Sequence, residues 1–584
     1  MRKISTKFKD IMIPLKAKKI KKYEFAGFDI ETYGSNNVFY MGSVVYRRGI
    51  KENVIIKKIF YNKQKMIEFM LSRRFAGYYF VATNLEFDFN GLIYKSKYWN
   101  DFKLIIGNTG FLFAEYKGKH HKLNHGSTKF IDTLNYVKMN VESLGKIIGI
   151  PKLKKPACLG KKPKNLEEKK ELENYNVQDS TISFEFMNFF QKTVNDIGGK
   201  LRMTIASTSL DIWRRKFQEV ILMKEERALD YKFNPSQMIF ESYYGGRTEA
   251  FKKGMFKNVY YYDVNSLYPS VMLLDYPLPQ SIKINNVPDI ETIKKFHGVS
   301  ECFIETPNIN KPLLPLRTKD KLIFPIGKFK GTYNHIELRK ALEIGYKVIP
   351  VKQIYYTQTF FPFKSFVKYF YSERIKYKSQ GNKIELIFKL ILNSLYGKFA
   401  ERHRQEYKMI DMKNYTDGVL GLRKEQLKWN DYDEKNNIVV LRRKSEFKGT
   451  HSFPILSCCV SSYARVKMYN FLVSESVIYT DTDSIMTTEK CFDENLELGG
   501  FKVEKFFKEA FIVKPKFYVG GDSIKNILES DDTGYIKLKG LNKACGNDIN
   551  NILKGKKIVK TKFVKLKESF IRNLEVNSII KVAK

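Results

Sequence analysis

The sequence predicts a multidomain protein of mixed α/β and α+β class. Its 584 residues allow about three to five domain-sized units, and a hydrophobic content of 43% excludes a disordered chain. The first third alternates strand-like and helix-like runs, which is typical of α/β folds. The remainder contains a strand followed by a sharp turn, a pair of helices and a hairpin, and polar stretches separate them.

The charge of the chain predicts a polyanionic partner. There are 103 Lys and Arg residues against 62 Asp and Glu residues, which gives a formal net charge of +41. Nucleic acid is the first choice and an anionic membrane surface the second. No apolar run approaches the ~18 residues needed to span a bilayer. The basic residues are scattered among 36 Tyr and 45 Phe, which suits phosphate contact combined with base stacking, although a Lys-rich coding bias also raises the charge.

Cysteine and histidine usage indicates neither a disulfide framework nor a zinc site. The six cysteines lie far apart, except Cys458 and Cys459, and form no C-x-x-C pair, so a reducing, intracellular compartment is expected. His120, His121 and His125 lie in a Lys/Gly/Asn-rich stretch, where a hairpin surface is favoured over metal ligands. The basic residues 1–22 lack the apolar core of a secretory signal. They resemble a mitochondrial transit peptide or, equally, an arm that contacts nucleic acid.

In the first third, apolar runs predict strands at Phe25–Glu31, Val54–Phe60 and Tyr78–Ala82, and a long helix at Leu166–Val194. Asn165 is the expected N-cap of this helix, and Glu168 would complete a capping box. A Lys/Pro/Gly-rich connector, residues 151–163, precedes the helix.

The first third also carries a set of acids. Asp29 and Glu31 form a D-x-E pair whose side chains face one side of a buried strand. Two buried acids repel each other unless a cation neutralises them. Asp88 and Asp179 follow, and Tyr175 lies one helical turn before Asp179. The D-x-E pair alone is weak evidence, but four acids and a tyrosine match the needs of a two-metal phosphodiester hydrolase.

The rest of the chain carries a second set of acids. A strand, Val259–Asp263, ends in a polar turn before Leu267-Tyr268-Pro269. Further on, the apolar runs around Tyr479–Ser484 predict a hairpin whose tip presents Asp481 and Asp483 on one side, as a site for hard divalent cations would. In a chain this basic, paired acids on a hairpin tip indicate metal-assisted phosphoryl transfer.

Between these acids, residues 361–399 predict two helices broken at Gly381-Asn382. Lys389, Asn393 and Tyr396, followed by Gly397, share one helical face. A lysine there can neutralise a triphosphate, and a tyrosine beside glycine can stack on a base pair. Taken alone, this helix is an ordinary amphipathic one. A polar segment, Glu401 to Gly449, separates it from the next apolar helix.

Together these patterns resemble the family B DNA polymerases over nearly the whole chain. Seven motifs occur in the family's order, which is far more specific than any one motif. The three exonuclease motifs are Asp29–Glu31, Asn84–Asp88 and Tyr175–Asp179, the three polymerase motifs are Asp263–Pro269, Lys389–Gly397 and Tyr479–Ser484, and Lys516-Phe517-Tyr518 is similar to the family's K-x-Y motif.

Within this family, the chain is similar to the protein-primed polymerases of phages, viruses and linear plasmids. The Tyr243-Tyr244-Gly245-Gly246 turn resembles their Y-x-G-G linker, and Ile131-Asp132-Thr133-Leu134 resembles their additional exonuclease motif. The 81 residues between Gly397 and Tyr479 exceed a simple return to the palm, and in that subgroup this interval carries an insertion linked to processivity and strand displacement. A similar insertion follows the first polymerase motif.

The resemblance implies a ribonuclease-H-like 3′-5′ exonuclease domain at residues 1–196 and a right-hand polymerase domain at residues 197–584. The palm would comprise about 197–350 and 450–525, the fingers about 351–400, an insertion about 401–450 and the thumb about 526–584.

The resemblance also implies roles for single residues. Two Mg²⁺ ions, which Mn²⁺ could replace, would be held at each site. Asp29, Glu31, Asp88 and Asp179 would bind the exonuclease ions, Tyr175 would place the attacking water and Lys154 would assist. Asp263, the Val264 carbonyl, Asp481 and Asp483 would hold the polymerase ions.

The substrate contacts follow in the same way. The single-stranded primer end would meet Thr32, Asn84, Phe87, Thr133 and Leu134. Other DNA contacts would come from Tyr243, Gly245, Gly246, Lys516 and Tyr518. The incoming nucleotide would meet Tyr268, Arg374, Lys378, Lys389, Asn393 and Tyr396, and Tyr268 would exclude a 2′-hydroxyl.

The implied function is a DNA-directed DNA polymerase with 3′-5′ proofreading, which replicates a viral or linear-plasmid genome as a monomer. Its expected partners are primer-template DNA, deoxynucleoside triphosphates and a terminal protein that serves as primer, with no membrane. The expected location is the host cytoplasm for a virus, or the mitochondrion for a linear plasmid. The alternatives are a family B polymerase with an ordinary nucleic-acid primer, a stand-alone exonuclease and a non-catalytic replication scaffold.

Overall fold

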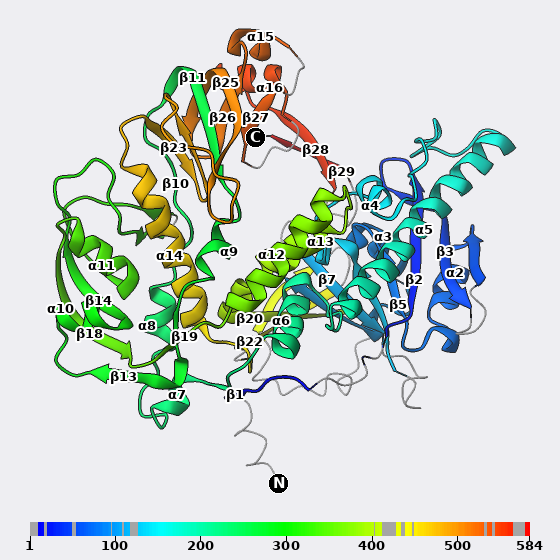
Figure 1. Cartoon of the computed structure of the whole chain (residues 1–584). Coiled ribbons are helices and arrows are strands. Elements are labelled where there is room, and N and C mark those ends of the chain that lie inside the picture. The colour runs from blue at the N-terminus through cyan, green and yellow to red at the C-terminus, as the bar shows by residue number, and fades with distance from the viewer. Residues whose placement is uncertain are drawn as a thin grey trace.

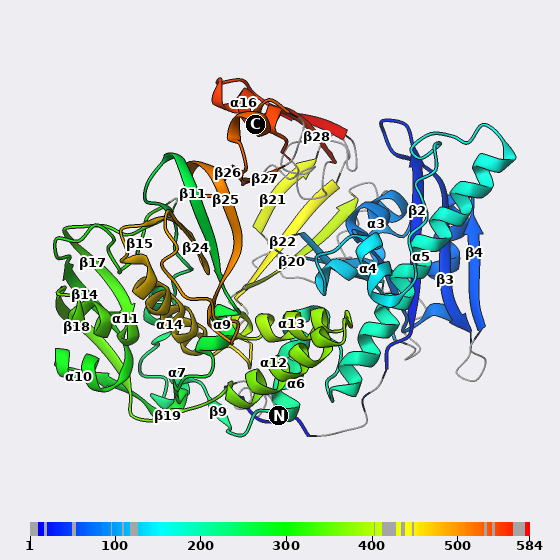
Figure 2. The same cartoon turned by 45° about the horizontal axis from the view of Figure 1, so that its top comes forward.

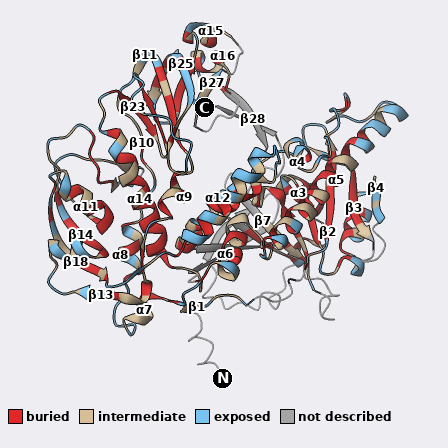
Figure 3. Cartoon of the chain, in the orientation of Figure 1, coloured by how far each residue is buried: buried red, intermediate tan, exposed pale blue. Residues whose placement is uncertain are grey.

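Two large β-sheets organise the chain in the computed structural model (Figure 1). The structure describes residues 10–16, 20, 22–48, 54–94, 96–107, 110–116, 126–319, 321–401, 403–411, 428–433, 438–446, 449–530, 534–539, 544–563 and 579–583. His120, His121 and His125 lie outside these ranges, as does most of the basic N-terminal stretch. Figure 3 shows buried residues along β2 and α14, which are central to the two halves of the molecule.

The first sheet has the strand order β21-β22-β20-β6-β7-β8-β5-β2-β3-β4 in the described residues. Its strands are β2 (Phe25–Tyr33), β3 (Val38–Arg48), β4 (Val54–Phe60), β5 (Tyr79–Ala82), β6 (Phe102–Gly107), β7 (Gly110–Tyr116), β8 (Thr128–Asp132), β20 (His403–Asp411), β21 (Lys428–Asp433) and β22 (Ile438–Glu446). β2, β5 and β8 run parallel, and their neighbours run antiparallel. The three strands predicted in this region are confirmed.

Alternate residues of β2 face different layers, as the pleat requires. Phe25 packs in the core that contains α5 (Leu166–Asp196), whereas Ala26 and Phe28 pack in the core of α2 (Lys63–Met70) and α3 (Leu85–Ile93). Gly27 allows α5 to approach closely, because a Cβ there would lie 2.1 Å from the Ser180 carbonyl oxygen. The helices therefore cover both faces of the sheet (Figures 1 and 2).

The N-terminus of α5 differs slightly from the predicted capping box. Asn165 caps the helix by accepting a hydrogen bond from the Glu168 N–H at 2.8 Å. The Glu168 carboxylate accepts from the N–H of Lys164 at 2.7 Å rather than from that of Asn165. The reciprocal bond therefore reaches one residue further back, because the chain turns before it enters the helix.

Residues 10–16 of the basic N-terminal stretch pack on the body of the protein. β1 (Ile11–Met12) pairs antiparallel with β9 (Leu222–Met223). Arg214 of α6 (Ile205–Lys216) donates to the Ile13 carbonyl, and Gln218 donates to the Met12 carbonyl, both at 2.8 Å. This part of the expected nucleic-acid arm is thus committed to internal contacts through its backbone.

The second sheet has the order β10-β23-β24-β11-β25-β26-β27 in the described residues. Its strands are β10 (Thr248–Ala250), β11 (Gly254–Val264), β23 (Val477–Asp481), β24 (Ser484–Thr487), β25 (Phe501–Lys514), β26 (Phe517–Gly521) and β27 (Tyr535–Leu538). β23 and β24 form the predicted hairpin, and β11, which carries Asp263, pairs with β24. The helix α14 (Pro454–Leu472), which contains the buried Cys458 and Cys459, packs beside this sheet (Figure 1). All six cysteines are free thiols.

Two further units lie around the second sheet. A four-stranded sheet, β13 (Ile282–Asn285), β18 (Lys347–Tyr356), β14 (His297–Glu305) and β17 (Lys328–Asn334), carries the helices α10 (Ile290–Lys295) and α11 (His335–Glu343). The predicted helix pair is α12 (Lys364–Ser379) and α13 (Glu385–Ser394), followed by the 3₁₀ turn η6 (Tyr396–Ala400).

The segment after η6 returns to the first sheet. β20 pairs with β6, so β20, β22 and β21 extend the N-terminal sheet, and Figure 2 shows them in yellow at the centre of the molecule. The C-terminal residues form α15 (Ile524–Leu528), α16 (Gly546–Leu553) and the pair β28 (Val559–Phe563) and β29 (Ile579–Ala583). No helix in the described ranges combines the length and apolar character that crossing a bilayer requires.

Candidate active sites

The four acids predicted in the first third converge from three elements. Asp29 and Glu31 lie on β2, Asp88 on α3 and Asp179 on α5. The Ile30 N–H donates to Asp88 Oδ1 at 3.2 Å, which ties α3 to β2. Asn176, one turn before Asp179, donates its amide to Asp29 Oδ2 at 2.6 Å and to Glu31 Oε1 at 3.4 Å. We refer to these four acids as the N-terminal acid cluster.

Burial and mutual repulsion make this cluster electrostatically strained. Burial raises the pKa of Asp29 well above its usual value, and the charges of Asp88, Glu31 and Asp179 raise it further. Burial, reinforced by Asp179, raises the pKa of Glu31 to about 7. Burial also raises the pKa of Asp88, although the hydrogen bond from Ile30 acts in the opposite direction. To stay ionised at neutral pH, these carboxylates therefore need a positive charge beside them.

Lys152 supplies part of that charge, in place of the expected Lys154. Lys152 Nζ forms an ion pair with Asp179 Oδ2 and lies 4.4 Å from the centre of the Tyr175 ring. Burial lowers the pKa of Lys152, but its contacts with Asp179 and Tyr175 outweigh that effect and raise it. The Lys154 side chain is exposed to solvent. The expectation for Lys154 is wrong, because the irregular connector turns a different lysine toward the site.

The residues of the N-terminal acid cluster fit divalent cations. Asp179 Oδ1 is buried and has no hydrogen-bond partner among the described residues, and carboxylate oxygens are the ligands that Mg²⁺ prefers. Within the described part of the chain, no three Asp, Glu, His or Cys side chains are gathered tightly around one point. The acids are therefore close neighbours whose repulsion a cation would relieve, rather than a closed coordination shell.

The residues expected to hold a single-stranded DNA end lie beside this cluster with different degrees of exposure. Asn84 is exposed in a left-handed conformation (φ 68°), and Thr32, Phe87 and Leu134 are half-buried. Thr133 is fully buried, and its hydroxyl donates to Thr83 at 2.9 Å, so its side chain has no surface to offer a ligand.

Asp132 has a positioning role that the sequence did not reveal. Its carboxylate accepts from the N–H groups of Asn84, Leu85 and Leu134 at 2.8–3.1 Å. These bonds hold the start of α3 against the end of β8. Asp132 therefore positions the exposed Asn84 and the half-buried Leu134 beside the N-terminal acid cluster.

The second set of acids lies where β11 meets the turn of the β23–β24 hairpin. Asp263, at the end of β11, is paired in register with Ser484, and the Val264 N–H donates to the Asp483 carbonyl at 2.8 Å. Burial raises the pKa of Asp263 to about 6, and Asp483 and Glu504 add to this rise. Burial likewise raises the pKa of Asp483, and Asp481 and Glu504 contribute. We refer to Asp263 and Asp483 as the hairpin acid pair.

Glu504 was missed at the sequence level. It lies on β25 two residues after Lys502, which is paired with Asp263. Its charge acts on both members of the hairpin acid pair. If residues 501–514 had been recognised as a strand next to β11, Glu504 would have been expected near Asp263.

Asp481 does not point with Asp483 as two residues on one strand would. The residue between them, Thr482, is left-handed (φ 68°), so Asp483 belongs to the turn. Lys516 Nζ contacts Asp481 Oδ1 and Oδ2 at 2.7 and 3.0 Å, and Thr248 donates to Oδ1 at 2.9 Å. Asp481 is therefore already paired, and it anchors Lys516, which also has a left-handed backbone (φ 60°).

The Tyr243–Gly246 turn supports the hairpin directly. The Thr482 N–H donates to the Arg247 carbonyl at 2.7 Å, and Thr248 is paired in register with Asp481. A Cβ at Gly246 would lie 2.7 Å from Thr482 Cγ2, whereas the space around Gly245 is open. The second glycine of this turn thus allows β10 to approach the residue between the two acids.

The residues expected to contact a nucleotide lie around the hairpin acid pair, and they differ in their exposure and in their contacts. Tyr268 stacks on Tyr396 with ring centres 4.9 Å apart and an angle of 15° between the planes. Lys389 lies close enough to oppose the rise in the pKa of Asp263. Lys378, Lys389 and Asn393 are exposed, whereas Arg374 is engaged with Ser266 and Glu385.

Tyr518, expected to contact DNA, is instead buried. Its ring is 1% exposed and lies 5.1 Å from that of Tyr479. It packs under the hairpin, so only Lys516 of the K-x-Y motif reaches the neighbourhood of the acids.

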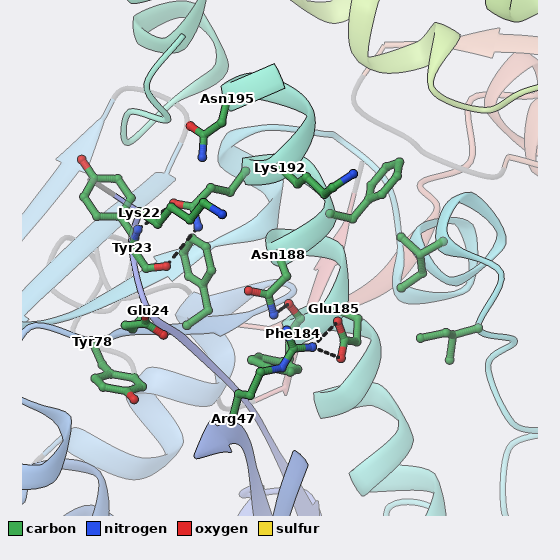
Figure 4. A pocket seen from close by; sticks show the side chains of 15 residues that line it. Lys22, Tyr23, Glu24, Arg47, Tyr78, Phe184, Glu185, Asn188, Lys192 and Asn195 are labelled. Carbon is green, nitrogen blue, oxygen red and sulfur yellow. Dashed lines mark hydrogen bonds and ion pairs between the residues drawn. The ribbon is translucent and has the colours of Figure 1, made fainter. Parts of the chain in front are cut away.

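A sizeable pocket lies apart from both sets of acids (Figure 4). It has a volume of about 750 Å³ and is lined by residues near the start of β2 and the C-terminal half of α5, among them Tyr23, Arg47 and Asn188. The Arg47–Glu185 ion pair at 3.2 Å spans part of it. The residues that line this pocket include none of the acids of the two sets, so the pocket does not indicate the position of either acid site.

Comparison with known proteins places the chain among DNA polymerases. Residues 149–476 match the profile of the family described as DNA polymerase type B, organellar and viral. A "Probable DNA polymerase" of Neurospora intermedia is 27% identical over 382 residues, which cover 62% of this chain and 38% of that protein. The "DNA-directed DNA polymerase" of Enterobacteria phage PRD1 is 28% identical over 309 residues, which cover 51% of each.

The chain spans about a third of the length of several fungal relatives, with 38% for Neurospora intermedia and 32% for Ascobolus immersus, and about half (54%) of that of Agaricus bitorquis.

The fold matches a solved polymerase over almost its whole length. Phi29 DNA polymerase complexed with primer-template DNA and incoming nucleotide substrates aligns with a TM-score of 0.68 at 19% identity, over 96% of this chain and 99% of that one. The chain therefore has the fold of an exonuclease domain followed by palm, fingers and thumb, as the sequence predicted. Since the family profile covers more than half of the sequence, the chain belongs to the organellar and viral type B DNA polymerases.

Proposed function

We propose that the protein is a DNA-directed DNA polymerase with 3′-5′ proofreading exonuclease activity, which replicates a viral or linear-plasmid genome and is primed by a terminal protein. The observation that carries this proposal is the presence of two separate acid sites, one on each large sheet. Family membership supports the synthetic activity. The family description, organellar and viral, and the relative from Enterobacteria phage PRD1 support a viral or linear-plasmid replicon.

At the synthetic site, Asp263 and Asp483 would hold two Mg²⁺ ions, with the Val264 carbonyl and Glu504 beside them. Bound Mg²⁺ would favour ionisation of the primer 3′-hydroxyl and stabilise charge on the leaving pyrophosphate. Lys389 would neutralise the triphosphate. The Tyr268–Tyr396 stack would support the sugar and the nascent base pair. Asp481 would act by holding Lys516 near the primer strand.

At the editing site, Asp29, Glu31, Asp88 and Asp179 would hold the ions, and bound Mg²⁺ would favour ionisation of the attacking water. Tyr175, under Lys152, would orient this water. The exposed Asn84 and the half-buried Phe87 and Leu134 offer surface for a single-stranded end, and Asp132 positions the backbone that carries Asn84 and Leu134.

Replacing Asp483 tests the synthetic site. We expect Asp483→Asn to reduce nucleotide incorporation on a primed template by at least about 10³-fold, because one of the two metal-facing carboxylates is lost. Trimming of a single-stranded 3′ end should persist at the wild-type rate. Incorporation that survives in this variant would remove the hairpin acid pair from the chemistry and favour a stand-alone exonuclease.

Replacing Asp29 tests the editing site. Asp29→Ala should abolish 3′ trimming and leave incorporation of correct nucleotides within about twofold of wild type, since the two sites lie on different sheets. Loss of both activities in a folded variant would contradict separate sites. A wild-type chain that neither extends nor trims in Mg²⁺ would favour a replication scaffold.

Protein priming has its own assay. The polymerase is incubated with labelled deoxynucleoside triphosphates, Mg²⁺ and the candidate terminal protein of the same replicon. A covalent protein–nucleotide adduct is expected. Failure to form it with a polymerase that extends ordinary primers would support a nucleic-acid primer instead.

A further inference from the structure

The turn between Asp263 and Tyr268 is held from outside by the helix α12. Arg374 donates from its guanidinium to Ser266 Oγ at 3.1 Å and to Glu385 Oε2 of α13 at 3.3 Å. The Arg374 and Glu385 side chains are only 12% and 19% exposed, so water screens this ion pair weakly. Ser266 is left-handed (φ 56°), a conformation that costs energy in a residue other than glycine and needs outside support.

A second contact joins α12 to the same turn. Asn265 donates from its amide to the Tyr371 hydroxyl at 2.9 Å and to the Leu496 carbonyl at 2.7 Å. Tyr371 lies about one helical turn before Arg374, so α12 contacts two successive residues of the turn. The position of α12 is therefore linked to the backbone that carries Asp263.

Glu385 introduces a negative charge on a surface expected to be cationic. It lies one helical turn before Lys389 on α13, so both face the same side. Arg374, Lys378 and Lys389 are the residues expected to meet the triphosphate. A guanidinium that pairs with a carboxylate through directed hydrogen bonds can make the same bonds to a phosphate, so the two anions compete for it.

We infer, on the basis of the polymerase activity proposed above, that Glu385 is a competing counter-ion that holds Arg374 on Ser266 until an incoming triphosphate displaces it. Glu385 is thus a positioning residue that sets nucleotide affinity. In the nucleotide-free enzyme, Arg374 bridges α13 and the turn between Asp263 and Tyr268. When the triphosphate binds, the guanidinium exchanges a carboxylate for phosphate oxygens, and the partly buried ion pair is lost. Nucleotide affinity is therefore lower than it would be if Arg374, Lys378 and Lys389 met the triphosphate without a competing carboxylate.

Single-nucleotide incorporation under pre-steady-state conditions tests this inference. Glu385→Gln keeps the shape of the side chain and removes its charge. We expect the apparent Kd for the deoxynucleoside triphosphate to fall about two- to fivefold, because the carboxylate that competes with the triphosphate for Arg374 is lost, with the maximal rate nearly unchanged. A side chain that merely supported Arg374 in its active position would give the opposite result, a higher Kd.

Two controls sharpen the experiment. Glu373→Gln removes a neighbouring acid of α12 that lies 3.9 Å from Lys376, and it should leave the Kd unchanged. In an Arg374→Gln background, Glu385→Gln should no longer lower the Kd, because the competing cation is gone. An unchanged or raised Kd in Glu385→Gln, or equal effects with and without Arg374, would overturn the inference. A thermal unfolding midpoint close to that of the wild type reports correct folding of each variant. A wild-type enzyme that incorporates no nucleotide would refute the proposed polymerase activity itself.

Discussion

At the scale of single residues, the carboxylates within each acid site repel one another. Asp29, Asp88 and Glu31 are buried close to one another, and their pKa values are raised by burial and by neighbouring carboxylates. Burial and the charges of Asp483 and Glu504 do the same to Asp263. Such groups lower the stability of the metal-free protein at neutral pH, because the unfolded chain ionises its acids more easily. A bound cation, or protonation at lower pH, relieves this cost.

We therefore expect Asp29→Asn to stabilise the metal-free protein while it removes trimming. The free energy of unfolding at pH 8 in EDTA should rise by about 1–3 kcal/mol, the usual cost of a buried polar or charged group that lacks a suitable partner, because a neutral amide replaces a carboxylate that its neighbours repel. Urea unfolding at fixed temperature measures this change. A variant less stable than wild type at pH 8 would contradict the repulsion.

The pH dependence gives a second readout. The folded protein binds protons at Glu31, with a pKa of about 7, and at Asp263, with a pKa of about 6, more tightly than the unfolded chain does. The stability of the metal-free wild type should therefore rise as the pH falls from 8 to about 5.5. Asp29→Asn should flatten this rise, and saturating Mn²⁺ should stabilise the wild type more at pH 8 than at pH 5.5.

At the scale of secondary-structure elements, the Tyr243–Gly246 turn and β10 support the β23–β24 hairpin. β10 pairs with β23, and the Thr482 N–H is bonded to the Arg247 carbonyl. Asp481 links the same hairpin to Lys516 just before β26. The hairpin is thus fixed from both sides, while Asp483 remains in the turn between them. This arrangement explains why a glycine is needed where β10 passes Thr482.

We expect Gly246→Ala to reduce incorporation about tenfold or more, since its Cβ would lie 2.7 Å from Thr482 Cγ2 and such overpacking costs about 1–3 kcal/mol. Trimming should be unaffected. Gly245→Ala, in open space, is the matched control and should retain activity. Adding Thr482→Ser removes the clashing methyl group and should restore part of the rate. Equal effects of the two alanine substitutions would argue against this contact.

At the scale of the whole molecule, the two halves are joined by backbone pairing as well as by the linker. β20 pairs with β6, so a segment from the polymerase half extends the N-terminal sheet. β1 pairs with β9, so residues that precede the first sheet are held by the second half. These contacts hold a strongly basic chain, with a formal net charge of +41, in one arrangement around two acid sites.

This charge predicts a steep dependence of DNA binding on salt. If at least six phosphates are contacted, the affinity for a primer-template should fall about 10³-fold or more between 50 and 200 mM salt. Fluorescence anisotropy in EDTA, which prevents both reactions, measures the slope. A slope corresponding to fewer than about two contacts would mean that most of the lysines are not engaged with DNA.

The sequence alone was sufficient to predict the strands that carry Asp29, Glu31 and Asp263, the helix that carries Asp179, the hairpin that carries Asp481 and Asp483, and the order of the two domains, whereas α3, which carries Asp88, was not predicted. These features depend on short-range patterns, such as the spacing of Asp29 and Glu31 or the periodicity of α5. Short-range patterns are preserved when the chain folds, because strand and helix geometry dictates which side chains share a face.

Which partners meet across the fold required the structure. Lys152 rather than Lys154 reaches Asp179, Glu504 joins the hairpin acid pair, Asp481 pairs with Lys516, and Thr133 and Tyr518 are buried. Each of these outcomes depends on an irregular turn or on residues far apart in the sequence. The direction of a side chain there is decided by packing and charge in three dimensions, which local spacing does not encode.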